Sequence, residues 1–299
     1  MKMSNSFTLI EILVVIVVVG ILSSFILVGM SSITNSANIA KGQAFANSMR
    51  NSLLIDLVSE WKLDDGSGTQ ATTKDYWSTN NGNLTNFVFN TTDGWRTGSS
   101  CTSGGCLLFN GINGYVALPE STKLKTDDIT LELWINPIIV TNGSPIRTTI
   151  TNKFYLAFHS DGGFAWHVRK SDNVGSYLYS NITVTTNKWH HIVATHKTLS
   201  FQRFYIDGVR VADASDITWS PLVVAGNYGW VIGGSDWSVS SAYYKGLIDD
   251  VRFYDDAISI SQIQQNYYLG INKLYKNNGI GFIEFNQRLV ELKSNLANN

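Results

Sequence analysis

The chain has 299 residues and a formal net charge of −1 at pH 7, with 22 Lys and Arg against 23 Asp and Glu. This balance gives neither nucleic acid nor an anionic membrane surface an electrostatic attraction to the chain, so neither is predicted as a charge-driven partner. The two cysteines and five histidines include no set at zinc-ligand spacing, so no zinc site is predicted.

Residues 7–30, FTLIEILVVIVVVGILSSFILVGM, form an apolar run in which Glu11 is the only ionisable side chain. As a helix the run would span roughly 36 Å, enough to cross a hydrocarbon core of about 30 Å. We therefore predict one membrane-spanning helix. A carboxylate at that depth costs about 2–3 kcal/mol or more without a partner, which makes Glu11 a candidate functional residue.

This segment resembles the N-terminus of a type IV prepilin. In that family a short basic leader is removed just before a Phe, the new amine is methylated, and a Glu five residues into the mature chain pairs with the amine of a neighbouring subunit. The match, FTLIE at 7–11, makes 1–6 the leader, Ser6 and Phe7 the processing site, and Glu11 the assembly residue. Ser6 stands where the family usually has Gly. The resemblance implies other pilin subunits as partners, and the alternative is a plain single-pass anchor that leaves Glu11 unexplained.

The helical pattern continues beyond the apolar run. One helix face is outlined by Met30, Ile33, Ala37, Ala40 and Ala44, which recur at steps of three and four. Leucines and valine at 53, 54, 57 and 58 extend the pattern. We therefore predict one pilin-type helix over 7–60, half in lipid or filament core and half against a globular head.

From Trp61 the composition changes to short alternating apolar segments separated by Gly, Asn, Thr and Ser, which is typical of an antiparallel β-sandwich. The predicted strands are Cys106–Phe109, Tyr115–Leu118, Ile129–Ile135, Phe154–Phe158, Gly163–Arg169, His190–His196, Phe201–Ile206, Gly229–Ile232 and Gly246–Tyr254. Ile206-Asp207-Gly208-Val209 predicts a tight hairpin. In ITLELWINP, Leu131 and Leu133 fall on one face of the strand, and Glu132 and Trp134 fall on the other.

Six of these segments, in order, resemble the laminin-G-like, concanavalin A-like jelly roll: WKLDDGSG, CLLFNGINGYV, ITLELWINP, WHHIVAT, FYIDGVRV and YKGLIDDVRFYDDAIS. The resemblance implies that 61–258 is one sandwich domain. Within 259–299, Ser259 and Gln262 have capping-box spacing, and an Asn-Asn-Gly break at 277–279 separates two amphipathic stretches. The predicted fold class is α+β: a long N-terminal helix, an antiparallel sandwich and a short C-terminal helical hairpin. The apolar stripe of the hairpin could cover the sandwich, the pilin helix or a neighbouring subunit.

The two cysteines are Cys101 and Cys106, separated by Thr-Ser-Gly-Gly. A domain exported behind a membrane segment lies in an oxidising compartment, which favours a disulfide over free thiols. A disulfide that closes a loop this short should stabilise the folded state by less than the ~3 kcal/mol expected for a 15-residue loop. The predicted role is local, to hold the loop before the strand that begins at Cys106.

Calcium is implied by the resemblance to the jelly roll. Asp64, Asp65, Asp75 and Asp249 lie in segments that match the first and last strands of the family, where a structural Ca²⁺ is often held. Carboxylate and carbonyl oxygens are its ligands. The alternative is that these aspartates form turns and cap loops.

Nine Trp and thirteen Tyr suggest a surface on which sugars stack. Trp77, Trp95, Tyr228 and Trp237 lie in loop-like stretches and are the candidate ligand-binding residues, and the alternative for each is ordinary packing. No enzyme is predicted, because retaining glycosidases need two carboxylates about 5 Å apart and Glu132 has no acidic same-face neighbour.

The predicted function is a type IV pilin-like subunit of a surface filament, whose extracellular head binds a glycan or protein for adhesion. Before assembly its single helix would anchor it in the cytoplasmic membrane. The alternatives are a pseudopilin of a secretion or DNA-uptake system, and a membrane-tethered lectin that does not polymerise.

Overall fold

The computed structural model describes residues 56–149, 153–159, 161–170, 174–180, 182–215, 217–221, 229–234 and 243–297. The chain divides into two compact units, Met1–Ser52 and Leu53–Asn299, and the described residues belong to the second. The predicted leader, processing site, assembly residue and membrane helix lie outside the described residues. Among the residues that are described, no helix combines the length and apolarity needed to cross a membrane.

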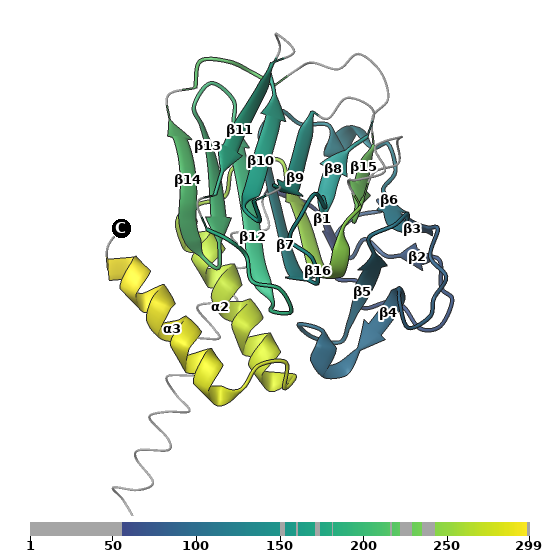
Figure 1. Cartoon of the computed structure of the whole chain (residues 1–299). Coiled ribbons are helices and arrows are strands. Elements are labelled where there is room, and N and C mark those ends of the chain that lie inside the picture. The colour runs from purple at the N-terminus through teal and green to yellow at the C-terminus, as the bar shows by residue number, and fades with distance from the viewer. Residues whose placement is uncertain are drawn as a thin grey trace, which may run out of the picture. The chain divides into compact units, whose positions relative to one another are not determined.

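The described strands form two antiparallel sheets that enclose a common core (Figure 1). Sheet A has the order β14 (Val209–Ser215), β13 (Phe201–Ile206), β12 (His190–Lys197), β7 (Ile129–Pro137), β16 (Lys245–Tyr254), β5 (Gly105–Asn110) and β4 (Gly94–Thr97), with β1 (Leu57–Trp61) paired to β16. Sheet B has the order β11 (Gly175–Tyr179), β10 (Phe164–Arg169), β9 (Phe154–Phe158), β8 (Ile146–Thr148), β15 (Trp230–Ile232), β6 (Tyr115–Ala117), β3 (Gly82–Thr85) and β2 (Thr72–Thr73). Two 3₁₀ turns, η1 (Gly98–Ser100) and η2 (Thr122–Leu124), lie between strands.

The core between the sheets comes from alternate residues of the strands. On β7, Leu131, Leu133 and Ile135 point into it, as the period of two predicts. On β9 and β10 the inward residues include Phe154 and Trp166, whose rings stack with centroids 5.7 Å apart. The sandwich predicted for this part of the chain is therefore confirmed.

The tight hairpin between β13 and β14 is also confirmed. Asp207 and Gly208 have φ values of 52° and 77°, the left-handed values that a two-residue hairpin turn requires. The Asp207 carboxylate accepts the backbone N–H of His191 at 2.8 Å, so the turn is tied to the start of β12.

Two helices, α2 (Ile260–Lys276) and α3 (Phe282–Ala297), cover the outer face of sheet A (Figure 1). The Ser259 side chain accepts the N–H of Gln262 and the Gln262 side chain accepts the N–H of Ser259, which confirms the predicted capping box. Tyr267 of α2 stacks on Trp134 of β7 with centroids 5.9 Å apart. Of the three positions left open for the hairpin, the structure places it on the sandwich.

The predicted end of the N-terminal helix is wrong. Leu57–Trp61 form strand β1, which pairs with β16, and Glu60 lies opposite Arg252 with an ion pair of 2.8 Å. Apolar residues at 53, 54, 57 and 58 fit a helical stripe, but a short apolar run cannot distinguish helix from strand. Here the edge hydrogen bonds of β16 and the burial of Trp61 in the core decide the strand.

Candidate functional site

Asp75 organises the turn that follows β2 and ties this turn to β1. Its Oδ1 accepts the backbone N–H groups of Glu60, Trp77 and Ser78, each at 3.0 Å. Its Oδ2 accepts the N–H of Asn80 at 3.1 Å. The carboxylate is buried, so these four donors replace the water it loses.

Asp65 lies across the same turn region, where it binds a different set of donors. Its Oδ2 accepts the Thr73 hydroxyl at 2.9 Å and the N–H of Lys74 at 2.8 Å. Its Oδ1 accepts the Tyr76 hydroxyl at 2.7 Å. That hydrogen bond raises the pKa of Tyr76 to about 12.

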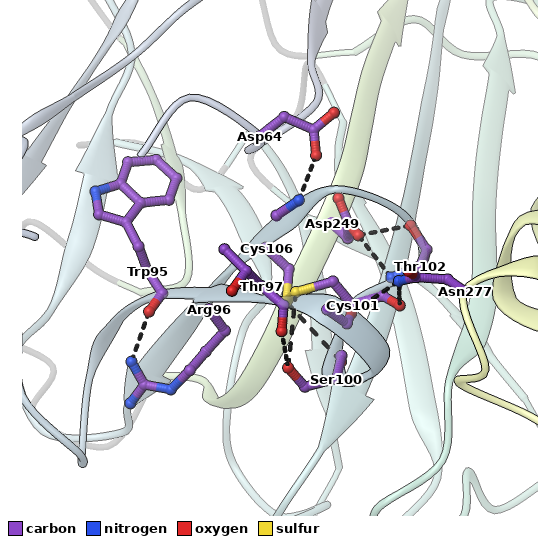
Figure 2. Close-up of a disulfide and its surroundings, with 12 residues drawn as sticks. Asp64, Trp95, Arg96, Thr97, Ser100, Cys101, Thr102, Cys106, Asp249 and Asn277 are labelled. Carbon is purple, nitrogen blue, oxygen red and sulfur yellow. Dashed lines mark hydrogen bonds between the residues drawn. A yellow bond between two sulfur atoms is a disulfide. The ribbon is translucent and has the colours of Figure 1, made fainter. Parts of the chain in front are cut away.

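Asp64 and Asp249 lie close to the disulfide loop (Figure 2). Asp64 accepts the N–H of Gly105 at 2.6 Å, and Asp249 accepts both the N–H and the hydroxyl of Thr102. Burial, together with the neighbouring Asp250 carboxylate, raises the pKa of Asp249 well above its usual range.

Within the described residues, no group of three or more His, Cys, Asp or Glu side chains is arranged to hold a metal ion. Asp65, Asp75 and Asp249 instead accept hydrogen bonds from N–H and O–H groups around them. This arrangement does not fit a calcium site built from the predicted ligands. Calcium stays a prediction of the family resemblance.

The predicted disulfide is present. Cys101 and Cys106 are bonded, with Cα atoms 5.4 Å apart, and both are buried (Figure 2). The disulfide loop and the η1 turn before it hold the turn between α2 and α3, because Asn277 donates to the Cys101 carbonyl at 3.1 Å and to the Gly98 carbonyl of η1 at 2.7 Å. The disulfide packs in the same apolar cluster as Trp134 and helix α2. Its role therefore includes docking the helical hairpin.

The predicted aromatic ligands have different positions. Trp77 is 45% exposed and lines a surface groove of ≈ 420 Å³. The prediction that Trp95 lies on a ligand-binding surface is wrong, because its side chain is 9% exposed and packs in the core. Its indole N–H donates to the Gln70 carbonyl at 2.8 Å. Tyr228 and Trp237 lie outside the described residues.

Glu132 is fully buried beneath α2. Its carboxylate accepts hydrogen bonds from Arg252 at 3.1 Å, Tyr254 at 2.8 Å and Asn266 at 2.9 Å, and lies 2.9 Å from His191 Nε2. Burial raises the pKa of Glu132, but Arg252 and then His191 outweigh that effect and lower it to about 2. The group is an ionised anchor between sheet A and the hairpin, and no substrate can reach it.

The outer face of sheet B carries aromatic side chains that sequence reasoning missed. Inward residues of β9, β10 and β11 pack in or against the core, so the alternate residues Tyr155, His167, Tyr177 and Tyr179 point to the opposite face. We call these four residues the aromatic row. Their strands pair in register, Tyr155 opposite His167 and His167 opposite Tyr177.

The aromatic row is continuous. Ring centroids are 4.3 Å apart between Tyr155 and His167, 4.4 Å between His167 and Tyr177, and 5.8 Å between Tyr177 and Tyr179. His167 is buried between its two tyrosine neighbours, whereas Tyr177 and Tyr179 are 49% and 45% exposed. The Tyr177 and Tyr179 rings are 9° from parallel. Flat, exposed and nearly parallel rings are a surface on which a sugar ring can stack.

The sequence holds only part of the signal for the row. Alternation in Phe154–Phe158 places Tyr155 on the face opposite Phe154, and Tyr177 and Tyr179 alternate with Leu178 in the same way. What the sequence lacks is the pairing of β9, β10 and β11, which brings residues more than twenty positions apart into one row.

Two family models match the sequence. The model described as "Concanavalin A-like lectin/glucanases superfamily" matches residues 110–264, and the "Prokaryotic N-terminal methylation motif" matches residues 1–27. A comparison with curated proteins finds no match.

Several solved structures share the fold. Domain 4 of AbnA, a GH43 extracellular arabinanase from Geobacillus stearothermophilus, in complex with arabinotriose, is 17% identical with a TM-score of 0.53 over 71% of this chain and 98% of that chain. The binding domain of Paraclostridial Mosquitocidal Protein 1 is 16% identical with a TM-score of 0.55 over 73% and 53% of the two chains. The ligand binding domain of botulinum neurotoxin serotype D in complex with N-acetylneuraminic acid is 13% identical with a TM-score of 0.53 over 72% and 51%. At these identities the likeness establishes the fold alone.

Proposed function

Because the chain belongs to the concanavalin A-like lectin/glucanases superfamily, we propose that its head is a non-catalytic glycan-binding domain displayed on a type IV pilus-like surface filament. The N-terminal methylation motif, which covers Phe7 and Glu11, supports processing and assembly with other pilin subunits. The filament presents many copies of the head outside the cell. Linked copies of a weak site raise avidity by about 10²–10⁴, so weak binding by each head suffices for adhesion.

The aromatic row is the observation that carries glycan binding. Tyr177 and Tyr179 present two nearly parallel, half-exposed rings on strands rather than on loops, so their positions are set by the sheet. Burial, and then the hydrogen bond with Tyr177, raise the pKa of Tyr155 above its usual value. The Tyr155 hydroxyl therefore stays protonated and uncharged at physiological pH, which suits this ring to stacking on neutral ring faces.

A non-catalytic role is supported by the placement of the buried acids. Glu60 and Glu132 both bind Arg252, at 2.8 Å and 3.1 Å, and neither side chain is more than 7% exposed. Two carboxylates separated by a guanidinium and covered by protein cannot flank a glycosidic bond. Known sugar complexes of similar folds, with arabinotriose and with N-acetylneuraminic acid, add fold-level support for binding.

A glycan array probed with the purified full-length chain in detergent tests the proposal. Wild type should bind a defined set of glycans, and Tyr177→Ala with Tyr179→Ala should lose that binding without a change in melting temperature. The control is Tyr268→Ala, which removes a similarly exposed tyrosine from α2 and should leave binding intact. No binding by folded wild-type chain, or loss of binding in the control alone, would refute the proposal and favour a pseudopilin with a structural head.

A further inference from the structure

His196 is a buried histidine whose ring has no polar partner. It lies near the end of β12, on the inward face that also carries Ile192 and Ala194, and its side chain is fully buried. Within the part of the chain that the structure describes, neither ring nitrogen makes a hydrogen bond. A neutral imidazole has one N–H donor to satisfy, whereas the protonated ring has two donors and a charge. This position therefore disfavours the protonated ring strongly.

The indole of Trp219 covers this imidazole. The two rings are 23° from parallel with centroids 5.2 Å apart, and the Phe154 ring centroid lies 6.3 Å from that of His196. Trp219 is only partly buried, whereas His196 is fully buried, so the indole lies between the imidazole and solvent. Water therefore gains access to the imidazole when this indole moves.

Trp219 belongs to residues 217–221, which we call the latch. These residues lie outside the strands and helices named above. The N–H of Ile217 donates to the Ser200 carbonyl at 3.1 Å, and the Trp219 carbonyl accepts the N–H of Leu199 at 3.4 Å. The latch can therefore move away without breaking the pairing of the two sheets.

The charged groups around His196 come from four elements. They are Asp127 and Asp128 before β7, Lys153 before β9, Lys170 after β10 and Lys197 next to His196 in β12. Asp127 pairs with Lys153 and Asp128 pairs with Lys197, each at 2.7 Å, and the Lys170 ammonium is 5.1 Å from the centre of the Trp219 ring. Opposite His196, β13 contributes the uncharged Gln202, and the latch has no ionisable side chain. Each nearby carboxylate thus already has a lysine partner.

The direction of the pH effect follows from burial. Burial lowers the pKa of His196 from 6.5 to about 4, because Asp128 and Asp127 offset only part of its effect and Lys153 adds to it. The closed latch therefore binds fewer protons than an open form in which water reaches the ring. Its stability is complete above about pH 6.5 and is lost as the pH falls towards 4. At tenfold for each pH unit, the ratio of open to closed latch should rise about 100-fold between pH 7 and pH 4.

We propose that His196 and the latch form an acid-sensitive device, in which protonation of the imidazole releases Trp219 and opens this end of the sandwich to water. The proton comes from solvent and forms the second N–H bond of the ring. In the closed latch that N–H has no acceptor, whereas in the open latch water accepts it. This device acts whether or not the head binds a glycan.

Amide hydrogen exchange of the full-length chain in detergent measures the ratio of open to closed latch. The Ile217 N–H is held by Ser200 and exchanges when the latch opens. Its protection, corrected for the intrinsic exchange rate, should fall about 100-fold between pH 7 and pH 4 and level off at lower pH. Leu84 of β3, whose N–H donates to the Ala71 carbonyl at 2.8 Å, is the internal control and should keep its protection.

Variants assign the effect to His196. His196→Leu has an apolar side chain that takes up no proton, so the protection of Ile217 should become independent of pH. The matched control is His159→Gln, which removes a histidine whose side chain is 48% exposed and should keep the 100-fold change of wild type.

Three results would overturn the device: equal protection of Ile217 in wild type at pH 7 and pH 4, an undiminished loss in His196→Leu, or a loss at Leu84 as large as that at Ile217. The last result would mean that the whole head unfolds rather than the latch. The wild-type curve decides the question even where His196→Leu fails to fold, because the loss must begin near pH 6.5 and end near pH 4.

Discussion

Substitution of Glu132 should produce a loss of stability that depends on pH in a calculable way. In the folded chain the pKa of this carboxyl is about 2 against an ordinary value of 4.5, since Arg252 and His191 outweigh the effect of burial. At about 1.4 kcal/mol for each pH unit, the difference gives roughly 3 kcal/mol of stability at neutral pH. The side chain is fully buried, so solvent does not screen this contribution.

The sign follows from the lowered pKa. The contribution is complete above about pH 4.5, where the unfolded carboxyl is ionised, and is lost as the pH falls towards 2, where the folded carboxyl becomes protonated. Glu132→Gln resembles the protonated acid at every pH. Wild type should therefore exceed the variant by about 3 kcal/mol at pH 7, and this gap should close near pH 2.

The assay is urea unfolding of the full-length chain in detergent, followed by tryptophan fluorescence at pH 7, 4 and 2. Glu120→Gln, at an exposed carboxylate, is the control and should change stability little at any pH. A gap between wild type and Glu132→Gln that is the same at pH 7 and pH 2 would refute the ionic account of this site. So would a gap below about 1 kcal/mol at pH 7.

Three further outcomes are expected. Replacing Cys101 and Cys106 by Ala should lower the free energy of unfolding by less than the ~3 kcal/mol expected for a 15-residue loop. It should also speed amide hydrogen exchange around Asn277, because the closed loop holds that turn. Unchanged exchange would show that the disulfide does not dock the helical hairpin. If calcium binds, adding it at a hundred times its dissociation constant to chelator-treated chain should stabilise the head by about 2.7 kcal/mol. Melting curves that superimpose with and without calcium would leave the predicted aspartates as turn-forming groups. Mass spectrometry of assembled filaments should find Phe7 as the first residue of the subunit, and subunits that still begin at Met1 would contradict this. The Glu11→Ala variant should remain in the membrane but be missing from filaments, because it lacks the carboxylate that pairs with the amine of a neighbouring subunit.

Most of the sandwich could be predicted because its strands are amphipathic or uniformly apolar. The strand Phe154–Phe158 has the predicted bounds. The strand predicted over Ile129–Ile135 is two residues longer in the structure, where it ends at Pro137. The capping box at Ser259 likewise depends on local chemistry, and the structure reproduces it.

The failures occur where tertiary contacts override local pattern. β1 matches a helical stripe in sequence and becomes a strand because β16 offers it an edge. Trp95 has loop-like neighbours in sequence but fills the core, where Gln70 accepts its N–H. Phe282 is an apolar residue at the start of α3, in the second amphipathic stretch, yet it is 65% exposed, because α3 packs through Leu292 and the partly buried Phe285 and Leu289 instead.

The aromatic row could not be predicted, for a different reason. Each of these residues lies in an ordinary strand, and the register of β9, β10 and β11 brings the His167 ring to 4.3 Å from the Tyr155 ring and 4.4 Å from the Tyr177 ring, measured between centroids. Register depends on long-range pairing that one sequence does not specify.

Electron microscopy of cells with glycan-coated gold tests the central claim most directly, since it reports display and binding together. The gold carries the glycan that the array selects. It should line the filaments of wild-type cells and be missing from cells with Tyr177→Ala and Tyr179→Ala, whose filaments should still form. Bare wild-type filaments, or gold bound equally to wild-type and variant filaments, would contradict the account.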